Sequence, residues 1–436
     1  MSPPRRLARE LSALDGQSVR IGGHLEDYRA LGGVAFALVR DGSGTTQVTL
    51  KKGTADPKLF ELFAGLPRES VVTVDGRVQR SEKSRRGVEL FPEHAELVTR
   101  AESPLPLGVV DKVGADLDTR LNHRVIDLRK PAVHAVFELR AAVLEGLRRS
   151  FTERGFLEVE TPKLLRQGAE GGSTLFGVDY FETRAYLAQS PQLYKQMLIA
   201  AGFERVFEIA PAFRAEPSDT VRHMTEFSSV DAEMSFIDGP EEIRKVLEGV
   251  VADTLRSARS RLETTGNPLG ANLLEPKLPF PRLSFDEVEG MLSRPGASQD
   301  LGTDDEKRLG ELVMANHGSP YYFITDFPTK VKAQTFYAWR RDDDPSRTGY
   351  FDLYHGHLEL ASGGPREHRV EKLTENIRSA GLAPEAFPGY LEAFRFGMPT
   401  HGGFGFGLDR FVQVLSGVPN IRETRLFPRD RYRLEP

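Results

Sequence analysis

One stretch, residues 203–236, constrains the fold of this 436-residue chain more than any other. Its two ends, residues 205–213 and 226–236, alternate apolar with polar side chains and are rich in Val, Phe and Ile. The segment between them carries Pro217 and other turn-forming residues. Alternating runs joined by a turn predict two antiparallel β-strands and a connecting loop.

Ionisable side chains gather at the ends of these two expected strands. They are Arg214, Glu216, Arg222, His223, Asp231 and Glu233. A buried charge without a partner costs several kcal/mol, so a purely structural hairpin rarely carries so many of them. Two interpretations remain. One is a solvated hairpin face, and the other is a site for a polyphosphate-bearing anion, with the guanidinium groups of Arg214 and Arg222 on its phosphate oxygens.

Length, composition and charge narrow the class of protein. A chain of 436 residues is long enough for two or three domains. The absence of cysteine excludes disulfides, thiol catalysis and Cys-ligated metals. The net charge of −5 argues against coating of nucleic acid by charge alone, and leaves a local contact open. No apolar run approaches the roughly 18 to 20 residues of a membrane span, and the N-terminus lacks an apolar signal core. We therefore expect a cytoplasmic protein without a membrane partner.

Residues 1–104 predict an OB-fold, a small β-barrel that often binds single-stranded nucleic acid. A helix is expected at 57–66, between the third and fourth of five β-runs. The runs cover residues 18–25, 33–39, 45–50, 71–79 and 88–98. Phe36 is a candidate to stack on an unpaired base, and Gln47 a candidate to bind a base edge. The alternative for Phe36 is a place in the barrel core.

A second domain is expected at residues 132–436, after a proline-containing hinge or linker at 105–131. It begins with a long amphipathic helix and a strand at 156–161 that ends at Pro162. Because proline cannot donate to a β-ladder, Pro162 indicates either a sheet edge in contact with a second subunit or an ordinary strand end. Residues 240–345 carry further helices without a chemical motif, and we expect them to form an insertion.

A glycine-rich loop and the helix after it carry further polar candidates. The loop, residues 168–181, contains Glu170 and lacks the spacing of a P-loop, so it is either a lid over a pocket or a plain turn. Ser190 is the expected N-cap of the next helix. Gln192 and Lys195 are three residues apart there and therefore lie on one helical face.

Hard oxygen donors gather on an expected strand–turn–strand near the C-terminal end. Asp352, Glu359 and Ser362 suit Mg²⁺ shared with phosphate groups. His355 and His357 do not complete a zinc site, because no third and fourth nitrogen or sulfur ligand accompanies them.

The segment 401–417 alternates glycine with other residues and predicts a strand that runs into a helix. Small residues at every second position allow a flat ligand to approach the backbone. Arg410 lies at the helix start, where the helix dipole disfavours a cation, and this placement favours contact with a ligand. Arg366 opens the preceding helix.

Three separated pieces resemble the signature motifs of one known family. The helix–strand ending at Pro162, FRAE at 213–216 and GFGFGLDR at 403–410 are similar to motifs 1, 2 and 3 of class II aminoacyl-tRNA synthetases. The OB-like domain indicates the aspartyl, asparaginyl and lysyl subgroup. EGGSTLF at 170–176 and QSPQLYKQ at 189–196 resemble the aspartyl branch, in its compact archaeal form. The resemblance implies an α+β fold class: an N-terminal OB-fold barrel plus a catalytic domain with an antiparallel sheet flanked by helices.

The resemblance also implies a role for each candidate residue. ATP would bind Arg214, Glu216, Arg222, His223, Phe227, Glu359, Ser362 and Arg410, of which Arg214 and Arg410 would be catalytic. Mg²⁺ would be held by Asp352, Glu359 and Ser362. L-Aspartate would bind Glu170, Gln192, Lys195, Asp231 and Arg366. The anticodon of tRNA(Asp) would be read by Phe36, Gln47 and Glu89, and Pro162 would lie in the interface of a homodimer.

Some alternatives remain open at this stage. A sister enzyme charging asparagine is disfavoured, because Lys195 and Arg366 would face a neutral amide. A non-catalytic relative that binds single-stranded RNA and an amino-acid-activating paralogue that uses no tRNA are the other two. The resemblance does not decide whether tRNA(Asn) is charged as well. Lys332 is followed by Ala-Gln where the family more often has Pro-Phe, so its role is also open.

Overall fold

The computed structural model describes residues 3–84, 86–110, 114–166, 175–217, 220–294 and 300–436. The chain divides into two compact units, Met1–Pro131 and Ala132–Pro436. No helix among the described residues is both long and apolar enough to cross a membrane.

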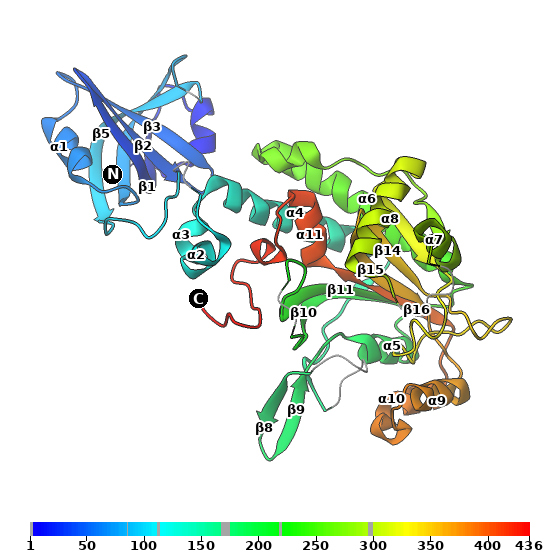
Figure 1. The fold of residues 1–436 in the computed structure, drawn as a ribbon. Helices are drawn as coiled ribbons and strands as arrows, with labels where there is room; N and C mark the ends of the chain where they lie inside the picture. Colours follow the sequence, from blue (N-terminus) through cyan, green and yellow to red (C-terminus); the bar gives the residue numbers. More distant parts are fainter. Residues whose placement is uncertain (1–2, 85, 111–113, 167–174, 218–219, 295–299) are drawn as a thin grey trace. The chain divides into compact units, whose positions relative to one another are not determined.

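The first unit contains a closed five-stranded barrel with the strand order β1-β2-β3-β5-β4 (Figure 1). The strands are β1 (Ser18–Leu31), β2 (Val34–Asp41), β3 (Gly44–Lys51), β4 (Val71–Arg80) and β5 (Val88–Thr99). Alternating Val, Ile, Leu and Ala side chains fill the interior. Its helices are α1 (Pro57–Gly65), α2 (Leu117–Asn122), α3 (Arg124–Asp127) and the 3-10 helix η1 (Ala8–Ala13). Asp56 caps α1 by accepting from the Lys58 amide, with Pro57 in the first turn. The predicted OB-fold barrel is confirmed.

The second unit is built on an eight-stranded sheet with the order β12-β13-β14-β15-β16-β11-β10-β6. These strands are β6 (Leu157–Glu158), β10 (Arg205–Phe213), β11 (Glu226–Ser235), β12 (Arg282–Ser284), β13 (Tyr321–Thr325), β14 (Phe351–His355), β15 (Leu358–Pro365) and β16 (His401–Gly407). Within this sheet, as far as the structure describes it, only the outer pairs are parallel, β12 with β13 and β10 with β6. A small sheet of β7 (Leu164–Leu165), β9 (Thr183–Leu187) and β8 (Gly177–Tyr180) stands apart, and its β8–β9 hairpin projects from the unit.

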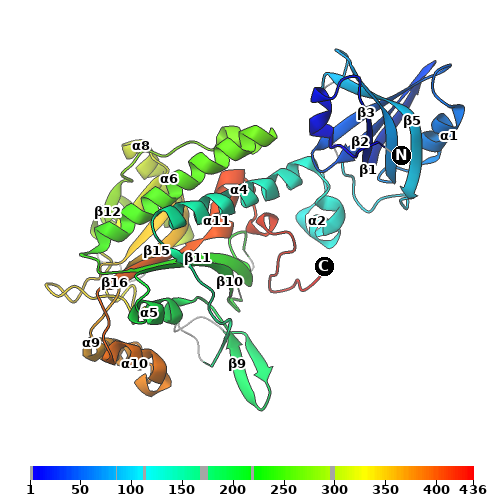
Figure 2. The same cartoon turned by 180° about the vertical axis from the view of Figure 1, so that it is seen from behind.

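Helices cover both faces of the large sheet. The helices are α4 (Pro131–Glu153), α5 (Gln192–Ala200), α6 (Pro240–Thr265), α7 (Phe285–Leu292), α8 (Thr303–His317), α9 (Val370–Ser379), α10 (Pro388–Arg395) and α11 (Leu408–Ser416), with 3-10 helices η2 (Pro268–Asn272), η3 (Pro384–Ala386) and η4 (Ile421–Thr424). Figures 1 and 2 show α4 and α6 side by side, and they share one hydrophobic core with the sheet and α11. A second core holds α7 to α10 against the other face. Strand β13 serves both cores, because Phe323 faces the first and Tyr322 the second.

Four local expectations differ from the structure. Arg366, expected to open a helix, instead directly follows strand β15, and α9 begins only at Val370. The strand expected at 156–161 is only two residues long, because Thr161 gives its amide to the Glu208 side chain at 2.8 Å and Pro162 has no amide hydrogen. Helix α5 begins one residue later than expected, so Pro191 rather than Ser190 occupies the cap position. Residues 240–345, expected as an insertion, supply strands β12 and β13 and helix α6 of the main fold.

Candidate active site

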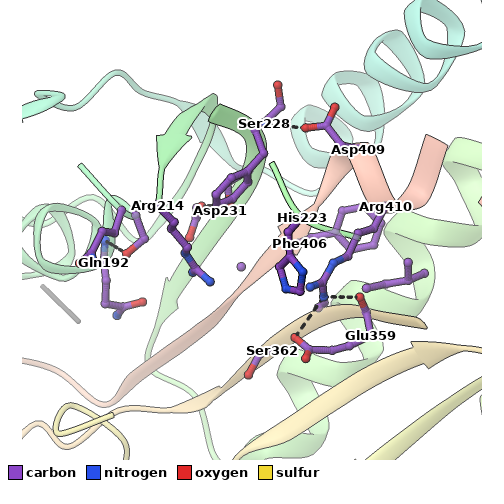
Figure 3. Close-up of a pocket in the computed structure, with 18 of the residues that line it drawn as sticks. Gln192, Arg214, His223, Ser228, Asp231, Glu359, Ser362, Phe406, Asp409 and Arg410 are labelled. Atoms are coloured by element: carbon purple, nitrogen blue, oxygen red, sulfur yellow. Dashed lines mark hydrogen bonds and ion pairs between the residues drawn. The ribbon is translucent and has the colours of Figure 1, made fainter. Parts of the chain in front are cut away.

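A cavity of about 480 Å³ opens over strands β11, β15 and β16, beside α5 and the start of α11 (Figure 3). This volume lies in the usual range of small-molecule sites. Candidates from distant parts of the sequence line it together: Gln192, Arg214, Glu216, Arg222, His223, Phe227, Asp231, Glu359, Ser362, Arg366 and Arg410. In Figure 3, Gln192 and Arg214 lie towards one end of this cavity, and Glu359, Ser362 and Arg410 towards the other.

Sheet register explains why these residues meet. Strand β11 pairs with β10 on one side and with β16 on the other, which places Asp231 beside Gly405. A Cβ atom at Gly405 would lie 3.3 Å from the Asp231 carboxylate, whereas one at Gly403 would overlap the carbonyl oxygen of Ala232. Glycine in β16 therefore serves close strand packing as well as the open floor of the pocket.

The end of the pocket near α5 carries a closed set of buried charges. Lys195 Nζ lies 3.1 Å from Asp231 Oδ1 and 3.3 Å from Glu233 Oε2. Arg366 Nε donates to Glu233 Oε1 at 2.9 Å, and its Nη1 donates to the Tyr350 hydroxyl. Burial opposes ionisation of Glu233, but Arg366 and Lys195 outweigh it and lower the pKa of Glu233. Burial likewise opposes the charge of Arg366, yet Glu233 raises the pKa of Arg366. Glu233 and Arg366 are thus held ionised as a pair.

The other arginines of the cavity make contacts nearer its opening, with Arg214 towards the α5 end and Arg410 at the opposite end (Figure 3). The Arg214 guanidinium lies over the Phe227 ring at 5.4 Å. Arg410 Nη1 donates to the Glu359 carbonyl oxygen at 2.9 Å. Arg222 forms an ion pair of 2.5 Å with Glu306 of α8.

His223 and Asp409 complete this end. His223 Nε2 lies 3.6 Å from Glu216, and burial lowers the pKa of His223 in spite of that carboxylate. Asp409 binds Arg140 and accepts from the Ser228 amide at 2.6 Å, so it locks α11 to α4 and β11.

The residues expected to hold Mg²⁺ come together only in part. Asp352 and Ser362 face each other across β14 and β15, next to an irregularity in the ladder, and Glu359 and Ser362 line the cavity. Asp352 is buried outside the cavity wall, and its Oδ2 accepts from Lys332 at 2.7 Å. Burial raises the pKa of Asp352 to about 6, while Asp352 raises the pKa of Lys332 despite burial, so both are charged at neutral pH. Lys332, whose role was open, is thus the counter-charge of Asp352.

The chemistry of these donors fits a magnesium ion that is bound by the protein and by phosphate groups together. Asp352 Oδ1 is buried and has no hydrogen-bond partner among the described residues. No group of three or more His, Cys, Asp or Glu side chains in the described part of the chain could hold a metal ion. Two carboxylates and a hydroxyl therefore need further oxygens from a ligand, as is usual for Mg²⁺.

The barrel brings its three candidates to one outer face. Phe36 is partly exposed and lies opposite Thr49, so it is not part of the barrel core. Gln47 is half-buried on β3 beside it. Glu89 of β5 accepts from the hydroxyl groups of Thr49 at 2.7 Å and Ser81 at 2.5 Å.

Two candidates remain. Pro162 is exposed near the edge strand β6. Glu170 lies outside the described residues.

Comparison with known proteins decides the family. Residues 116–431 match the family described as tRNA synthetases class II (D, K and N), and residues 19–98 match the OB-fold nucleic acid binding domain. The chain belongs to this class II tRNA synthetase family. The predicted fold class and family are confirmed.

Relatives of this synthetase cover almost its whole length. The aspartate--tRNA(Asp) ligase of Thermococcus kodakarensis is 45% identical over 427 residues, or 97% of each chain. The aspartate--tRNA(Asp/Asn) ligase of Methanopyrus kandleri is 46% identical over 426 residues, again 97% of each chain. The asparaginyl-tRNA synthetase of Pyrococcus horikoshii, complexed with asparaginyl-adenylate, superposes with a TM-score of 0.88 at 31% identity and 99% coverage of each chain.

Sequence reasoning missed several residues of this synthetase site. Glu233 was noted but given no role, although its spacing of two from Asp231 places both on one strand face. Tyr350 and Tyr337 line the cavity, and Arg366 lies over both rings at 5.4 Å. Glu306 comes from a helix whose sequence carries no motif.

Proposed function

We propose that this synthetase activates L-aspartate with ATP and transfers the aspartyl group to tRNA(Asp). The supporting observation is the buried pair of cations fixed by Glu233 at one end of the cavity, with Arg366 in the cavity wall and Lys195 buried behind it. The α-ammonium group of the substrate draws on Asp231, so a side-chain carboxylate restores the charge balance around the two cations, whereas an amide does not. Such a polar site can reject the wrong analogue by about 10⁴-fold.

The first reaction needs positioning more than acid–base chemistry. The α-carboxylate of aspartate attacks the α-phosphorus of ATP, and pyrophosphate leaves with the electrons of the broken P–O bond. The attacking group is already ionised and needs no protein base. Arg214 neutralises charge at the α-phosphate, and Arg410, Arg222 and His223 serve the outer phosphates. Glu216 and Phe227 hold the adenine, with Arg410 on the other face of the ring.

The remaining candidate residues bind the magnesium ion and the α-ammonium group of aspartate. Asp352, Glu359 and Ser362 would hold Mg²⁺, which supplies positive charge to the phosphates when bound. Asp231, Gln192 and Glu170 orient the α-ammonium group. In the second reaction a terminal-adenosine hydroxyl of tRNA attacks the aspartyl carbonyl carbon, and AMP leaves.

The chain is divided by role in this proposal. Residues 1–104 bind the anticodon through Phe36, Gln47 and Glu89, residues 105–131 form the hinge, and residues 132–436 are catalytic. A homodimer forms through Pro162 and the edge strand β6, where Leu157 is 51% exposed. Sedimentation of the purified chain tests the dimer, which a purely monomeric sample would exclude.

Amino-acid-dependent pyrophosphate exchange tests the activity. We expect exchange with aspartate and little with asparagine; the reverse preference would assign the asparaginyl activity instead. Charging of purified tRNA(Asp) and tRNA(Asn) then defines the tRNA specificity, which differs between the two relatives named above. Phe36→Ala should lower aminoacylation about tenfold and spare exchange, because a lost base stack costs roughly 1–3 kcal/mol. Equal loss in both assays would contradict a barrel that serves only tRNA.

A further inference from the structure

A chain of buried hydrogen bonds runs behind the amino-acid end of the pocket. It joins Gln192 and Gln196 of α5, Tyr390 of α10 and His401 at the start of β16. Their exposed fractions are 4%, 0%, 4% and 1%, and of these four only Gln192 lines the cavity. Gln192 and Gln196 are four residues apart and so lie on one helical face.

His401 sets the direction of this chain. Its Nδ1 lies 2.9 Å from the Pro399 carbonyl oxygen, which can only accept, so Nδ1 carries the proton. Burial lowers the pKa of His401 to about 4; Arg366 lowers it further, and Glu233, which raises it, does not restore it. The ring is therefore neutral at pH 7 and its Nε2 is an acceptor. Gln196 Nε2, 2.9 Å away, must be the donor.

The orientation of Gln196 then fixes the orientation of Gln192. With its Nε2 on His401, Gln196 presents Oε1 to two donors, Gln192 Nε2 at 2.9 Å and the Tyr390 hydroxyl at 3.0 Å. Two donors match the two lone pairs of an amide oxygen. Because Gln192 Nε2 is held by Gln196, the Gln192 oxygen is the atom left for a ligand.

We propose that Gln196, Tyr390 and His401 are positioning residues that turn Gln192 Oε1 towards the α-ammonium group of the amino-acid substrate. This inference rests on the proposed function. Asp231 lines the same cavity, with its Oδ2 fixed by the Ser229 hydroxyl at 2.6 Å. The ammonium group thus meets a carboxylate and an oriented amide oxygen. If Gln192 turned over, its NH₂ group would oppose the cation.

Kinetics of pyrophosphate exchange give the first test. Gln196→Met removes the acceptor that holds Gln192, and we expect KM for aspartate to rise about tenfold, with KM for ATP unchanged. Tyr390→Phe removes one of two donors to Gln196 and should raise KM for aspartate about threefold. Tyr322→Phe is the matched control, because it also removes one buried hydroxyl donor, to the Gly356 carbonyl oxygen, and should change neither constant. A rise in both KM values for Gln196→Met would indicate loss of the pocket and overturn the proposal.

Binding of two stable analogues gives the decisive test. One is the sulfamoyl analogue of aspartyl-adenylate, and the other is the same molecule without its α-amino group. We expect Gln196→Met to weaken only the first, about tenfold. Equal weakening of both, or no change in their ratio, would overturn the proposed role. If Gln196→Met does not fold, the same ratio in Tyr390→Phe decides. Failure of the unaltered chain to activate aspartate is a separate result, which would remove the proposed function itself.

Discussion

The two ends of the pocket hold their charges in different ways. The amino-acid end is the end near α5, where the proposed function places aspartate. Its four charged side chains are at most 5% exposed and pair with one another; they are those of Lys195, Asp231, Glu233 and Arg366. At the nucleotide end, Arg222 and Arg410 are 15% and 29% exposed. Their partners there, Glu306 and Glu359, are carboxylate residues with which a phosphate would compete.

This difference in burial bears on how selective each end is for its ligand and how easily it can rearrange around that ligand. A buried, fully paired set of charges is costly to disturb and therefore keeps its geometry before the ligand arrives. Partly exposed pairs contribute little on their own, so a polyphosphate can exchange them at small cost. We infer that the rigid end selects the amino acid and that the looser end rearranges around ATP.

The largest expected effect is at Arg366. Replacing Arg366 with Ala removes the cation beneath the substrate carboxylate and leaves Glu233 without its main partner. Breaking a buried ion pair costs about 3–5 kcal/mol, so aspartate activation should fall by about 10²- to 10⁴-fold. ATP affinity, measured by equilibrium binding, should stay within about twofold. Near-normal exchange would remove Arg366 from the pocket, and a parallel loss of ATP binding would show that the two ends are not independent.

Acid should lower the free energy of unfolding, because His401 is buried in its neutral form. In the unfolded chain this histidine has a pKa of about 6.5, whereas burial lowers it to about 4 in the fold. Between these values the unfolded state binds a proton that the native state does not, so stability is full above pH 6.5 and declines as the pH falls. The loss approaches about 3 kcal/mol near pH 4. Urea unfolding at pH 7 and pH 4.5 should show a smaller difference for His401→Gln than for the unaltered chain; an equal difference would contradict a neutral, buried ring.

Sequence patterns predict regular elements better than they predict pairings. The five barrel strands follow from alternation, and helix α1 follows from its Asp-Pro start. Residues 240–345 gave no chemical motif, because their contribution to the sheet depends on long-range pairing of β12 and β13 with β14. The strand after residue 156 is short because of another long-range contact: the Thr161 amide donates a hydrogen bond to the Glu208 side chain.

The candidate site shows the same limit. Arg214, Asp231 and Arg410 lie within motifs that sequence spacing reveals, and the fold brings all three to one cavity. The ion pair between Lys332 and Asp352 joins residues 20 positions apart, and no local sequence pattern predicts it. Buried partners such as Gln196 and His401 acquire meaning only when α5 and β16 are seen together.

A smaller effect is expected at the nucleotide end from Glu306. Its ion pair with Arg222 competes with phosphate for the same guanidinium group. Glu306→Gln keeps the size of the side chain and removes the charge, so KM for ATP should fall about threefold, with KM for aspartate unchanged. Pyrophosphate exchange at varied ATP gives both constants. A higher KM for ATP would mean that Glu306 positions Arg222 for phosphate binding, and does not compete with phosphate for it.

The smallest effect concerns His223, beside the same arginines. Burial lowers the pKa of His223, with Arg410 and Arg222 adding to the effect, so the imidazole is mainly neutral at pH 7 in the absence of ligand. Phosphate groups favour the protonated ring, and ATP binding should therefore tighten as the pH falls from 8 to 6, by about threefold beyond the change seen in His223→Gln. Titration with a non-hydrolysable ATP analogue measures this difference. Identical slopes for the two proteins would place His223 away from the phosphates and leave Arg222 and Arg410 as the adaptable cations of this end.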